Sequence, residues 1–282
     1  MNTNTLPLFD KDPRNTSAAA LAASLAHNAP KGHWDELRGS GPELSPHWTQ
    51  FFDNLGHDGL GELNRRQQNL AQQLRDNGVT YNVYADASGP QRPWSVDLFP
   101  LLVEPEAWRR IEAGLIQRVT ALNLFLDDLY HDQKVLKDKI VPPSLILGAK
   151  HFRREFMHFT VPRGIYVHIC GTDLIRDAAG NYLVLEDNLR CPSGASYMIE
   201  NRSAMRRALP QVFDRYGVRP VEGYTDDLLK ALLHLAPQTA EKPNVVLLTP
   251  GVHNSAYFEH CFLARQMGIP IVEGRDLVVR DA

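Results

Sequence analysis

Two apolar stretches joined by a short turn constrain the fold of this chain more than any other feature. GIYVHICGTDLIR (164–176) and NYLVLEDN (181–188) both have the composition of strands, and the four residues Asp-Ala-Ala-Gly lie between them. Asp and Gly are typical turn residues, so the pattern predicts a β-hairpin. With a four-residue loop, we expect Arg176 to face Asn181 across the two strands.

The expected register brings acidic side chains together. In that register Asp173 faces Val184 and is the diagonal neighbour of Glu186, roughly 7 Å away at the backbone. Because side chains alternate along a strand, Asn188 shares this face and Asp187 points to the other. A loop of three or five residues would instead place Asp173 and Glu186 on opposite faces.

The side chains on this face offer oxygen ligands alone. Two carboxylates and a carboxamide, without His or Cys, favour Mg²⁺ or Mn²⁺ over zinc. Mg²⁺ usually keeps several waters and binds substrate phosphate as well, so the pattern predicts a phosphate-bearing partner. The alternative is a structural role, because Asp and Asn are common turn formers at strand ends.

The spacing of these residues resembles that of a known family. Asp173, Glu186 thirteen residues later, Asn188 and the turn at Pro192–Gly194 are similar to the magnesium-binding signature of ATP-grasp ligases. Longer stretches, among them LEDNLRCPSGASYMIENR and LLTPGVHNSAYFEHCFLARQMG, resemble the circularly permuted type 2 ATP-grasp family, which is related to glutathionylspermidine synthase. The resemblance covers most of the chain beyond the N-terminal region.

This resemblance implies a reaction and its cofactors. Enzymes of this kind join a carboxylate to an amine: ATP converts the carboxylate to an acyl phosphate, and the amine then displaces phosphate. By this comparison Asp173, Glu186 and Asn188 are metal ligands, and the cofactors are ATP and Mg²⁺ (or Mn²⁺). The implied substrates are a small-molecule or peptide carboxylate and an amine.

Residues that follow the signature are candidates for binding substrate or phosphate. Arg190 is a candidate to stabilise the transferring phosphoryl group, and the alternative is a surface arginine that pairs with Asp187. Backbone amides around Ser193, Gly194 and Ser196 are candidates to bind a substrate carboxylate or phosphate at the start of the next helix. The alternative for these three residues is an ordinary helix cap.

A second candidate loop lies near the C-terminus. The apolar run NVVLLTP is typical of a buried strand, and open α/β sheets bind ligands at the carboxyl ends of their strands. Asn254, Ser255 and Glu259 follow this end and are candidates for substrate contact. Turn formation and capping of the next helix, by Asn254 or Ser255, are the alternative.

Composition and periodicity divide the chain into three regions. Residues 1–45 are rich in small and polar residues and are expected to form a loose N-terminal arm. Residues 46–235 are expected to form a helical region and a partial ATP-grasp fold with the metal-binding hairpin; its clearest helix is at 108–129. After a linker at 236–243, residues 244–282 are expected to begin a Rossmann-like βαβ domain that is cut short. The fold class is thus α/β, or α+β of ATP-grasp type.

Charge and hydropathy exclude several classes of function. The formal net charge of −3 gives no electrostatic basis for binding nucleic acid. No apolar run approaches the length that spans a bilayer, and the N-terminus lacks the features of a secretory signal. The three cysteines form no CxxC pair, which favours a reducing compartment. We expect a cytoplasmic protein with no nucleic-acid or membrane partner.

The sequence departs from the family pattern in two respects. Gly171 stands where many ATP-grasp enzymes carry an arginine, two residues before the first metal aspartate. In addition, no stretch reads as the lysine-bearing strand and glycine-rich loop that close over the phosphates. We therefore expect the chain alone to be inactive, with a downstream segment or partner subunit completing the site. The alternative is a non-catalytic ATP-grasp-like module that binds a partner protein or a peptide carboxylate.

Overall fold

The computed structural model describes residues 16–81, 92–236 and 242–280. The N-terminal fifteen residues, most of the linker at 236–243 and the last two residues therefore lie outside the described part. The chain forms two compact units, which are described separately below. The first unit comprises Met1–Leu102, Arg176–Asn181 and Ser193–Ala282, and the second comprises Val103–Ile175 and Tyr182–Pro192.

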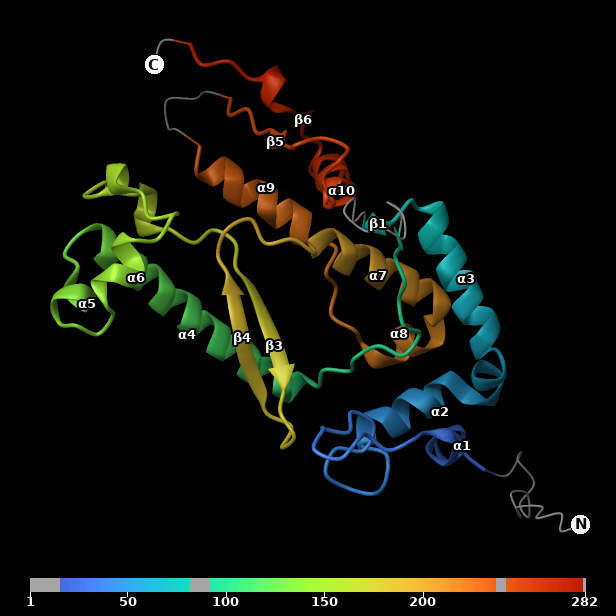
Figure 1. Cartoon of the computed structure of the whole chain (residues 1–282). Helices are drawn as coiled ribbons and strands as arrows, with labels where there is room; N and C mark the ends of the chain where they lie inside the picture. The colour runs from blue at the N-terminus through green and yellow to red at the C-terminus, as the bar shows by residue number, and fades with distance from the viewer. Residues whose placement is uncertain (1–15, 82–91, 237–241, 281–282) are drawn as a thin grey trace, which may run out of the picture. The chain divides into compact units, whose positions relative to one another are not determined.

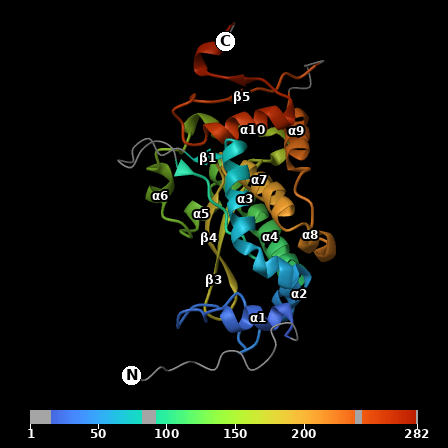
Figure 2. The ribbon, with the colours of Figure 1, turned by 90° about the vertical axis from the view of Figure 1, so that its right-hand side faces the viewer.

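The first unit is mainly helical. Its helices are α1 (Ala18–Leu25), α2 (Pro46–Gly61), α3 (Leu63–Asp76), α7 (Ala195–Ala208), α8 (Pro210–Tyr216), α9 (Tyr224–His234) and α10 (Tyr257–Met267) (Figure 1). Its short strands are β1 (Thr80–Tyr81), β2 (Arg92–Pro93), β5 (Leu247–Leu248) and β6 (Ile271–Val272). β1 and β2 pair in antiparallel fashion, whereas β5 and β6 pair in parallel. α9 and α10 lie side by side in both views (Figures 1 and 2).

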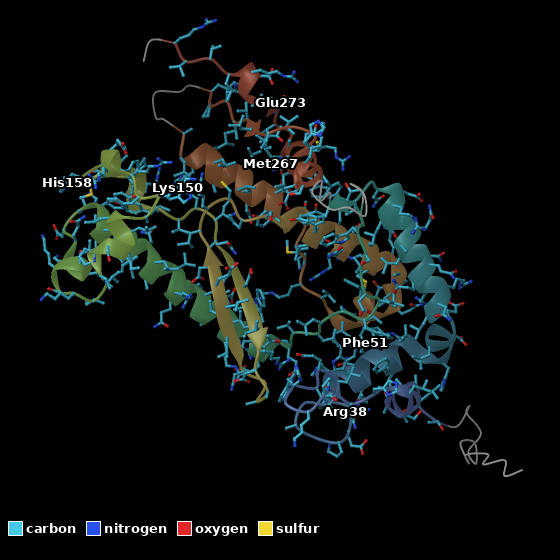
Figure 3. The ribbon with its side chains drawn as sticks, viewed as in Figure 1. Arg38, Phe51, Lys150, His158, Met267 and Glu273 are labelled. Carbon is cyan, nitrogen blue, oxygen red and sulfur yellow. The ribbon has the colours of Figure 1, made fainter. Side chains whose placement is uncertain are left out.

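An apolar core holds α2, α3, α7 and α8 together. Phe51 of α2 is fully buried in this core (Figure 3), and its ring lies edge-on to that of Trp48 at 5.0 Å. α3 contributes Leu70 and Leu74, whose four-residue spacing puts them on one face of the helix. The predicted helical region is not one continuous helix, because Gly56 has a φ of +71° inside α2 and α3 starts after a separate break.

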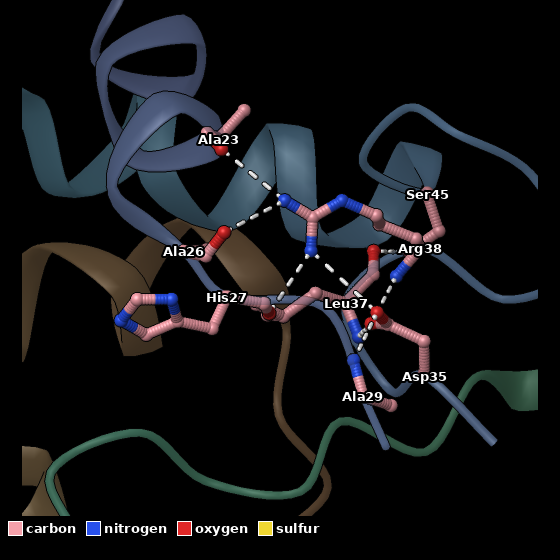
Figure 4. A network of polar contacts seen from close by, with 8 residues as sticks. All are labelled: Ala23, Ala26, His27, Ala29, Asp35, Leu37, Arg38 and Ser45. Atoms are coloured by element: carbon pink, nitrogen blue, oxygen red, sulfur yellow. Dashed lines mark hydrogen bonds and ion pairs between the residues drawn. The ribbon is translucent and has the colours of Figure 1, made fainter. Parts of the chain in front are cut away.

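Part of the segment that we expected to be a loose arm is folded. The alanine-rich helix α1 buries Ala18, Ala19 and Ala22, and it packs against α2. Arg38 binds the C-terminal end of α1, where helix carbonyls lack partners (Figure 4). Its guanidinium donates to the carbonyl oxygens of Ala23, Ala26 and His27 at 3.1–3.3 Å and lies 3.5 Å from the carboxylate of Asp35.

The turn after β3 belongs to the same unit and contacts this N-terminal segment. The guanidinium of Arg176 lies 4.9 Å from the ring centroid of Trp34 and pairs with Glu36 at 2.6 Å. Gly180 lies so close to Trp34 that a Cβ atom there would be 2.6 Å from the indole ring. Residues 34–36 are thus packed against the hairpin turn.

The C-terminal part of the first unit has the predicted strand–helix–strand order. α10 connects β5 to β6, and the parallel register pairs Leu247 with Ile271 and Leu248 with Val272. Gly268 ends α10 in the left-handed conformation, with φ of +65°, which glycine adopts readily. The structure therefore contains one βαβ unit here, and the Rossmann-like assignment remains an expectation.

The second unit consists of one long helix, several short turns and most of a β-hairpin. Its elements are α4 (Pro105–Tyr130), α5 (Lys134–Lys137), α6 (Pro143–Leu147), β3 (Gly171–Arg176, whose last residue belongs to the first unit) and β4 (Tyr182–Asn188). α4 confirms the helix predicted at 108–129. Lys150 and His158 mark the exposed loop that follows α6 (Figure 3). Within the described ranges, no helix has the combined length and hydropathy that crossing a membrane requires.

Candidate functional site

The turn between β3 and β4 differs from the expected one. The N–H of Asp177 donates to the carbonyl of Asn181, and the N–H of Gly180 donates to the carbonyl of Asp177, both at 3.0 Å. Gly180 has a φ of +86°, so these bonds define a three-residue loop with a type I turn and a left-handed glycine. The prediction that Arg176 faces Asn181 is therefore wrong, since Asp177 takes that place. The Asp177 carboxylate favours this turn because it also accepts from the backbone of Ala179 at 2.9 Å.

At the other end of the hairpin, side-chain contacts give the facing that we predicted. The hydroxyl of Thr172 donates to Oδ1 of Asp187 at 2.9 Å, so these two side chains share one face. Their neighbours Asp173 and Glu186 project from the opposite face, because side chains alternate along each strand. Nδ2 of Asn188 donates to Oε1 of Glu186 at 3.1 Å, which places Asn188 on that face as well.

The turn and the Thr172–Asp187 contact imply different facings of the two strands, and one extra residue in β4 accounts for this difference. From the turn to the Thr172–Asp187 contact, the chain advances five residues along β3 and six along β4. The alternation of burial in β4 slips at the same place, where Leu185 and Glu186 are both exposed. These observations indicate a β-bulge in β4. The bulge puts Asp173 and Glu186 back on one face but moves the register by a further residue. Asp173 then lies opposite Glu186 and not opposite Val184, so that predicted pairing is wrong.

The resulting face carries three exposed polar side chains: Asp173, Glu186 and Asn188. Carboxylate and amide oxygens are the ligands that Mg²⁺ and Mn²⁺ prefer. In the part of the chain that the structure describes, there is no group of three or more His, Cys, Asp or Glu side chains arranged to hold a metal. A metal at this face would therefore depend on the amide oxygen of Asn188 beside the two carboxylates.

Asp187 has a partner that the sequence did not suggest. Nε of Arg118, in α4, donates to Oδ2 of Asp187 at 2.6 Å, and only 8% of the Asp187 side chain is exposed. The alternative in which Arg190 pairs with Asp187 is thus wrong. Arg190 is exposed instead, and its Nη1 lies 3.3 Å from Nδ1 of His151. No sequence signal links Arg118 to β4, because 69 positions separate the two residues.

Steric crowding explains why Gly171 stands where many ATP-grasp enzymes carry an arginine. A Cβ atom on Gly171 would lie 2.7 Å from Cβ of Pro192, and 3.7 Å from Cβ of Asn188. The proline turn after β4 therefore occupies the space that a longer side chain at position 171 would need.

The N-terminus of α7 already holds a carboxylate from the same unit. The N–H of Gly194 donates to both oxygens of Glu259 at 2.9 Å, and the N–H and hydroxyl of Ser196 donate to one of them at 3.0 and 2.8 Å. Glu259 is 4% exposed, whereas Ser193 is on the surface. Of the donors expected to bind a substrate carboxylate or phosphate, those of Gly194 and Ser196 are thus engaged by α10 of this chain.

The buried Glu259 charge affects the groups around it. Burial and the charge of Glu259 raise the pKa of Tyr197 to about 12, and the same two causes raise the pKa of Tyr224. Burial lowers the pKa of His260, although the charge of Glu259 opposes this effect. Nδ1 of His260 lies 2.9 Å from the hydroxyl of Thr249, at the end of the strand that precedes the second candidate loop.

The second candidate loop has a turn-forming role in the structure. Oδ1 of Asn254 accepts from the backbone N–H of Ala256 at 2.9 Å. α10 begins at Tyr257 with Ala256 as its N-cap residue, and no side chain caps it. The expectation that Asn254 or Ser255 caps this helix is therefore wrong, and Asn254 instead shapes the turn before it.

Comparisons with known proteins agree with the resemblance seen in the sequence. The model of the family described as circularly permuted ATP-grasp type 2 matches residues 100–282. An uncharacterized protein of Synechocystis sp. is 44% identical over 252 residues, which are 89% of this chain and 52% of that protein. An uncharacterized protein of Mycobacterium leprae is 46% identical over 231 residues, 82% of this chain and 40% of that protein.

A third relative carries a more informative name. A Frankia casuarinae protein with the provisional name glutamate–cysteine ligase 2-2 is 34% identical over 273 residues, 94% of this chain and 31% of that protein. This chain thus spans about half, or less, of the length of the relatives that it matches. The family match covers well over half of the chain, so this protein belongs to the circularly permuted type 2 ATP-grasp family.

Proposed function

We propose that this chain carries the metal-binding half of an ATP- and magnesium-dependent carboxylate–amine ligase. The hairpin supports this most directly, because Asp173, Glu186 and Asn188 are exposed and side-chain alternation assigns them to one face. Membership of the ATP-grasp family supports the reaction class. The name of the Frankia relative supports a ligase that acts on amino acids.

The donors on this face fit a hard divalent cation. Asp173 and Glu186 would hold Mg²⁺ (or Mn²⁺) through their carboxylates. Nδ2 of Asn188 donates to Glu186, so its amide oxygen is the atom left for the metal. A cation held by these residues would supply positive charge that offsets the charge of the ATP phosphates.

Arg190 is proposed to bind the transferring phosphoryl group. Its side chain is exposed just beyond β4, and its contact with His151 uses one of the five N–H donors of a guanidinium. Because a guanidinium can only donate, Nδ1 of His151 is the acceptor in this contact. A guanidinium held in this way has donors for two phosphoryl oxygens.

The proposed reaction has two steps. A carboxylate oxygen of the acid attacks the γ-phosphorus of ATP, and the bond to ADP breaks to leave an acyl phosphate. The amine nitrogen then attacks the carbonyl carbon, phosphate leaves, and the amine loses a proton. The products are an amide, ADP and inorganic phosphate. We further propose that this takes place in the cytoplasm, where ATP is available.

The nucleotide-closing lobe is proposed to come from polypeptide beyond these residues. The greater length of the relatives supports a further segment of the same polypeptide over a partner subunit. Gly194, Ser196 and Glu259 are not proposed as substrate contacts, because they bind one another. Asn254 and Ser255 remain candidates, since they lie at the carboxyl end of β5.

The test measures ADP release by a polypeptide that has the full length of the relatives. Glutamate and cysteine are the first pair tried, followed by mixtures of other amino acids and peptides. We expect Mg²⁺-dependent release of ADP and phosphate, and Glu186→Ala to lower the rate roughly 100-fold. Release of AMP would exclude an acyl phosphate. Full activity of Glu186→Ala would exclude the proposed site, and absence of turnover with retained peptide binding would favour the non-catalytic module.

A further inference from the structure

We infer that Asp187 is a positioning residue, which keeps the three candidate metal ligands on one face of the hairpin. This inference rests on the proposed function, because it concerns the same metal site. Asp187 lies between Glu186 and Asn188 in β4 but points to the opposite face, where 8% of its side chain is exposed. It is therefore directed away from the candidate ligands, and its role lies in the contacts that it makes.

Each carboxylate oxygen of Asp187 binds a different element of the second unit. Oδ2 accepts from Nε of Arg118 in α4 at 2.6 Å, and Oδ1 accepts from the hydroxyl of Thr172 in β3 at 2.9 Å. Thr172 directly precedes Asp173 in the sequence. One carboxylate thus fixes both strands at the positions next to the candidate ligands.

The hydrogen bond between Thr172 and Asp187 matters because of the bulge in β4. The turn alone specifies a register in which Asp173 and Glu186 would lie on opposite faces. The extra residue in β4 changes the facing, and the contact between Thr172 and Asp187 is the side-chain pair that holds the new register. A shift of one residue would move every following side chain to the other face. Loss of this contact is therefore expected to separate the candidate ligands.

Arg118 of α4 pairs with Asp187 and not with its acidic neighbour Glu186. Glu186 and Asp187 are adjacent, and the guanidinium engages the carboxylate that faces α4. Hydrogen bonds between charged groups are about twice as strong as those between neutral ones. Residues that orient metal ligands commonly change metal affinity about 10- to 100-fold when they are replaced.

The experiment measures binding of Mn²⁺ to the whole chain by electron paramagnetic resonance, without nucleotide. Asp187→Asn keeps the shape of the side chain and removes its charge, whereas Thr172→Val keeps the shape and removes the hydroxyl. We expect each change to weaken Mn²⁺ binding about tenfold, and Thr172→Ser, which keeps the hydroxyl, to stay within about twofold of the wild type. The spectrum of bound Mn²⁺ should change with Asp187→Asn and stay unchanged with Thr172→Ser.

A further variant separates this inference from the proposed function. If the unaltered chain does not bind Mn²⁺, or if Glu186→Ala binds it as the wild type does, the proposed metal site is wrong. If Glu186→Ala abolishes binding while Asp187→Asn and Thr172→Val bind normally, the positioning role is overturned. The positioning role is also overturned if Asp187→Asn or Thr172→Val lowers the stability of the protein but leaves its Mn²⁺ affinity unchanged.

Matched controls address folding. Glu106→Gln disrupts a different carboxylate–arginine pair, that of Glu106 with Arg109 on the exposed surface of α4, and should leave Mn²⁺ binding unchanged. Circular dichroism and urea unfolding show whether each variant is folded. Arg118→Lys, which keeps the charge but changes the donor, replaces Asp187→Asn if that variant does not fold. Normal Mn²⁺ affinity of Arg118→Lys and Thr172→Val together would then contradict the inference.

Discussion

Glu259 and Ser196 form a buried contact in which one carboxylate oxygen accepts from both the backbone N–H and the hydroxyl of the serine, at 3.0 and 2.8 Å. Gly194 adds a further backbone donor. The positive end of a helix dipole favours a negative charge at this place. An anion-binding helix N-terminus is thus satisfied from within the fold, by a side chain of α10.

We predict that this contact stabilises the first unit. Glu259→Ala would leave the donors of Gly194 and Ser196 buried without an acceptor, so the free energy of unfolding should fall by about 2–4 kcal/mol. Glu259→Gln retains one oxygen and should lose less. Urea unfolding followed by circular dichroism measures both, and Glu112→Ala, on the exposed surface of α4, is the control. Equal stability of the alanine variant and the wild type would contradict this prediction.

The hairpin turn should be sensitive to a methyl group at Gly180. An alanine there has to adopt a positive φ and also places Cβ 2.6 Å from the Trp34 ring. Gly32 has a similar φ of +85° but no atom within 4 Å of a Cβ, so Gly32→Ala reports the backbone strain alone. We expect Gly180→Ala to lower the free energy of unfolding by about 1–3 kcal/mol more than Gly32→Ala.

A double variant identifies the cause of that difference. Trp34→Ala in the Gly180→Ala background removes the ring that the new methyl group would meet. The added cost of the Gly180→Ala change should then approach that of Gly32→Ala. Equal costs of the two single alanine variants would show that Trp34 moves aside without penalty.

Stability should decrease as the pH falls through the titration range of His260. Burial lowers the pKa of this histidine in the folded state, below the ordinary value of 6.5. The unfolded chain therefore takes up the proton first as the pH falls, which favours unfolding. The loss begins near pH 6.5 and is complete below the folded pKa. Urea unfolding at several pH values should show a smaller loss in His260→Asn than in the wild type.

The control for this experiment is His57→Asn, which removes an exposed histidine of α2 and keeps the same change in the number of titrating groups. The hydrogen bond to Thr249 can be retained by the asparagine, so the variant isolates the charge. An identical pH dependence of the wild type and His260→Asn would contradict the assignment.

Arg38 should hold the N-terminal segment in place. Its side chain is 9% exposed and satisfies carbonyl groups at the end of α1. Arg38→Met keeps most of the apolar volume but removes these bonds, and we expect local stability to fall by about 1–3 kcal/mol. Hydrogen exchange of the α1 amides measures this directly. Arg65→Met, which removes an exposed arginine of α3, should leave that exchange unchanged.

Local patterns in the sequence predicted the elements well. The spacing of apolar residues located α4, and turn residues located the hairpin. The order of β5, α10 and β6 was also as predicted. These features depend on residues that are close in sequence, where propensity and periodicity act.

Contacts between distant residues could not be predicted in the same way. Arg118 meets Asp187 across 69 positions, and Glu259 meets Ser196 across 63. The sequence identified the α7 N-terminus as an anion site but not the anion, because the partner comes from another helix. The packing of α1 and Arg38 was also missed. Alanine side chains bury little area, so a short alanine-rich helix such as α1 is stabilised mainly by tertiary contacts, which the sequence does not reveal.

The hairpin assigns Asp173 and Glu186 to one face, as expected, although the loop length on which that expectation was based is wrong. We expected the facing of Asp173 and Glu186 from a four-residue loop, whereas the loop has three residues and the strand has a bulge. Turn type depends on the φ of a single glycine, and bulges have no reliable sequence signal. The two irregularities shift the register in the same direction, by two residues in all, and a shift of two residues leaves the facing unchanged.

The face to which Glu186 and its neighbours point thus depends on two features: the number of residues in the turn and the presence of the extra residue in β4. Deleting one residue from the loop at Ala178–Gly180 would exchange the faces of β4, and deleting one residue at the bulge would do the same for the residues that follow the bulge. The two deletions together would restore the facing of the residues beyond the bulge, because their effects cancel there. Insertions and deletions in this hairpin should therefore be tolerated in pairs, so that a defect at the turn is suppressed by a second change far along the strand.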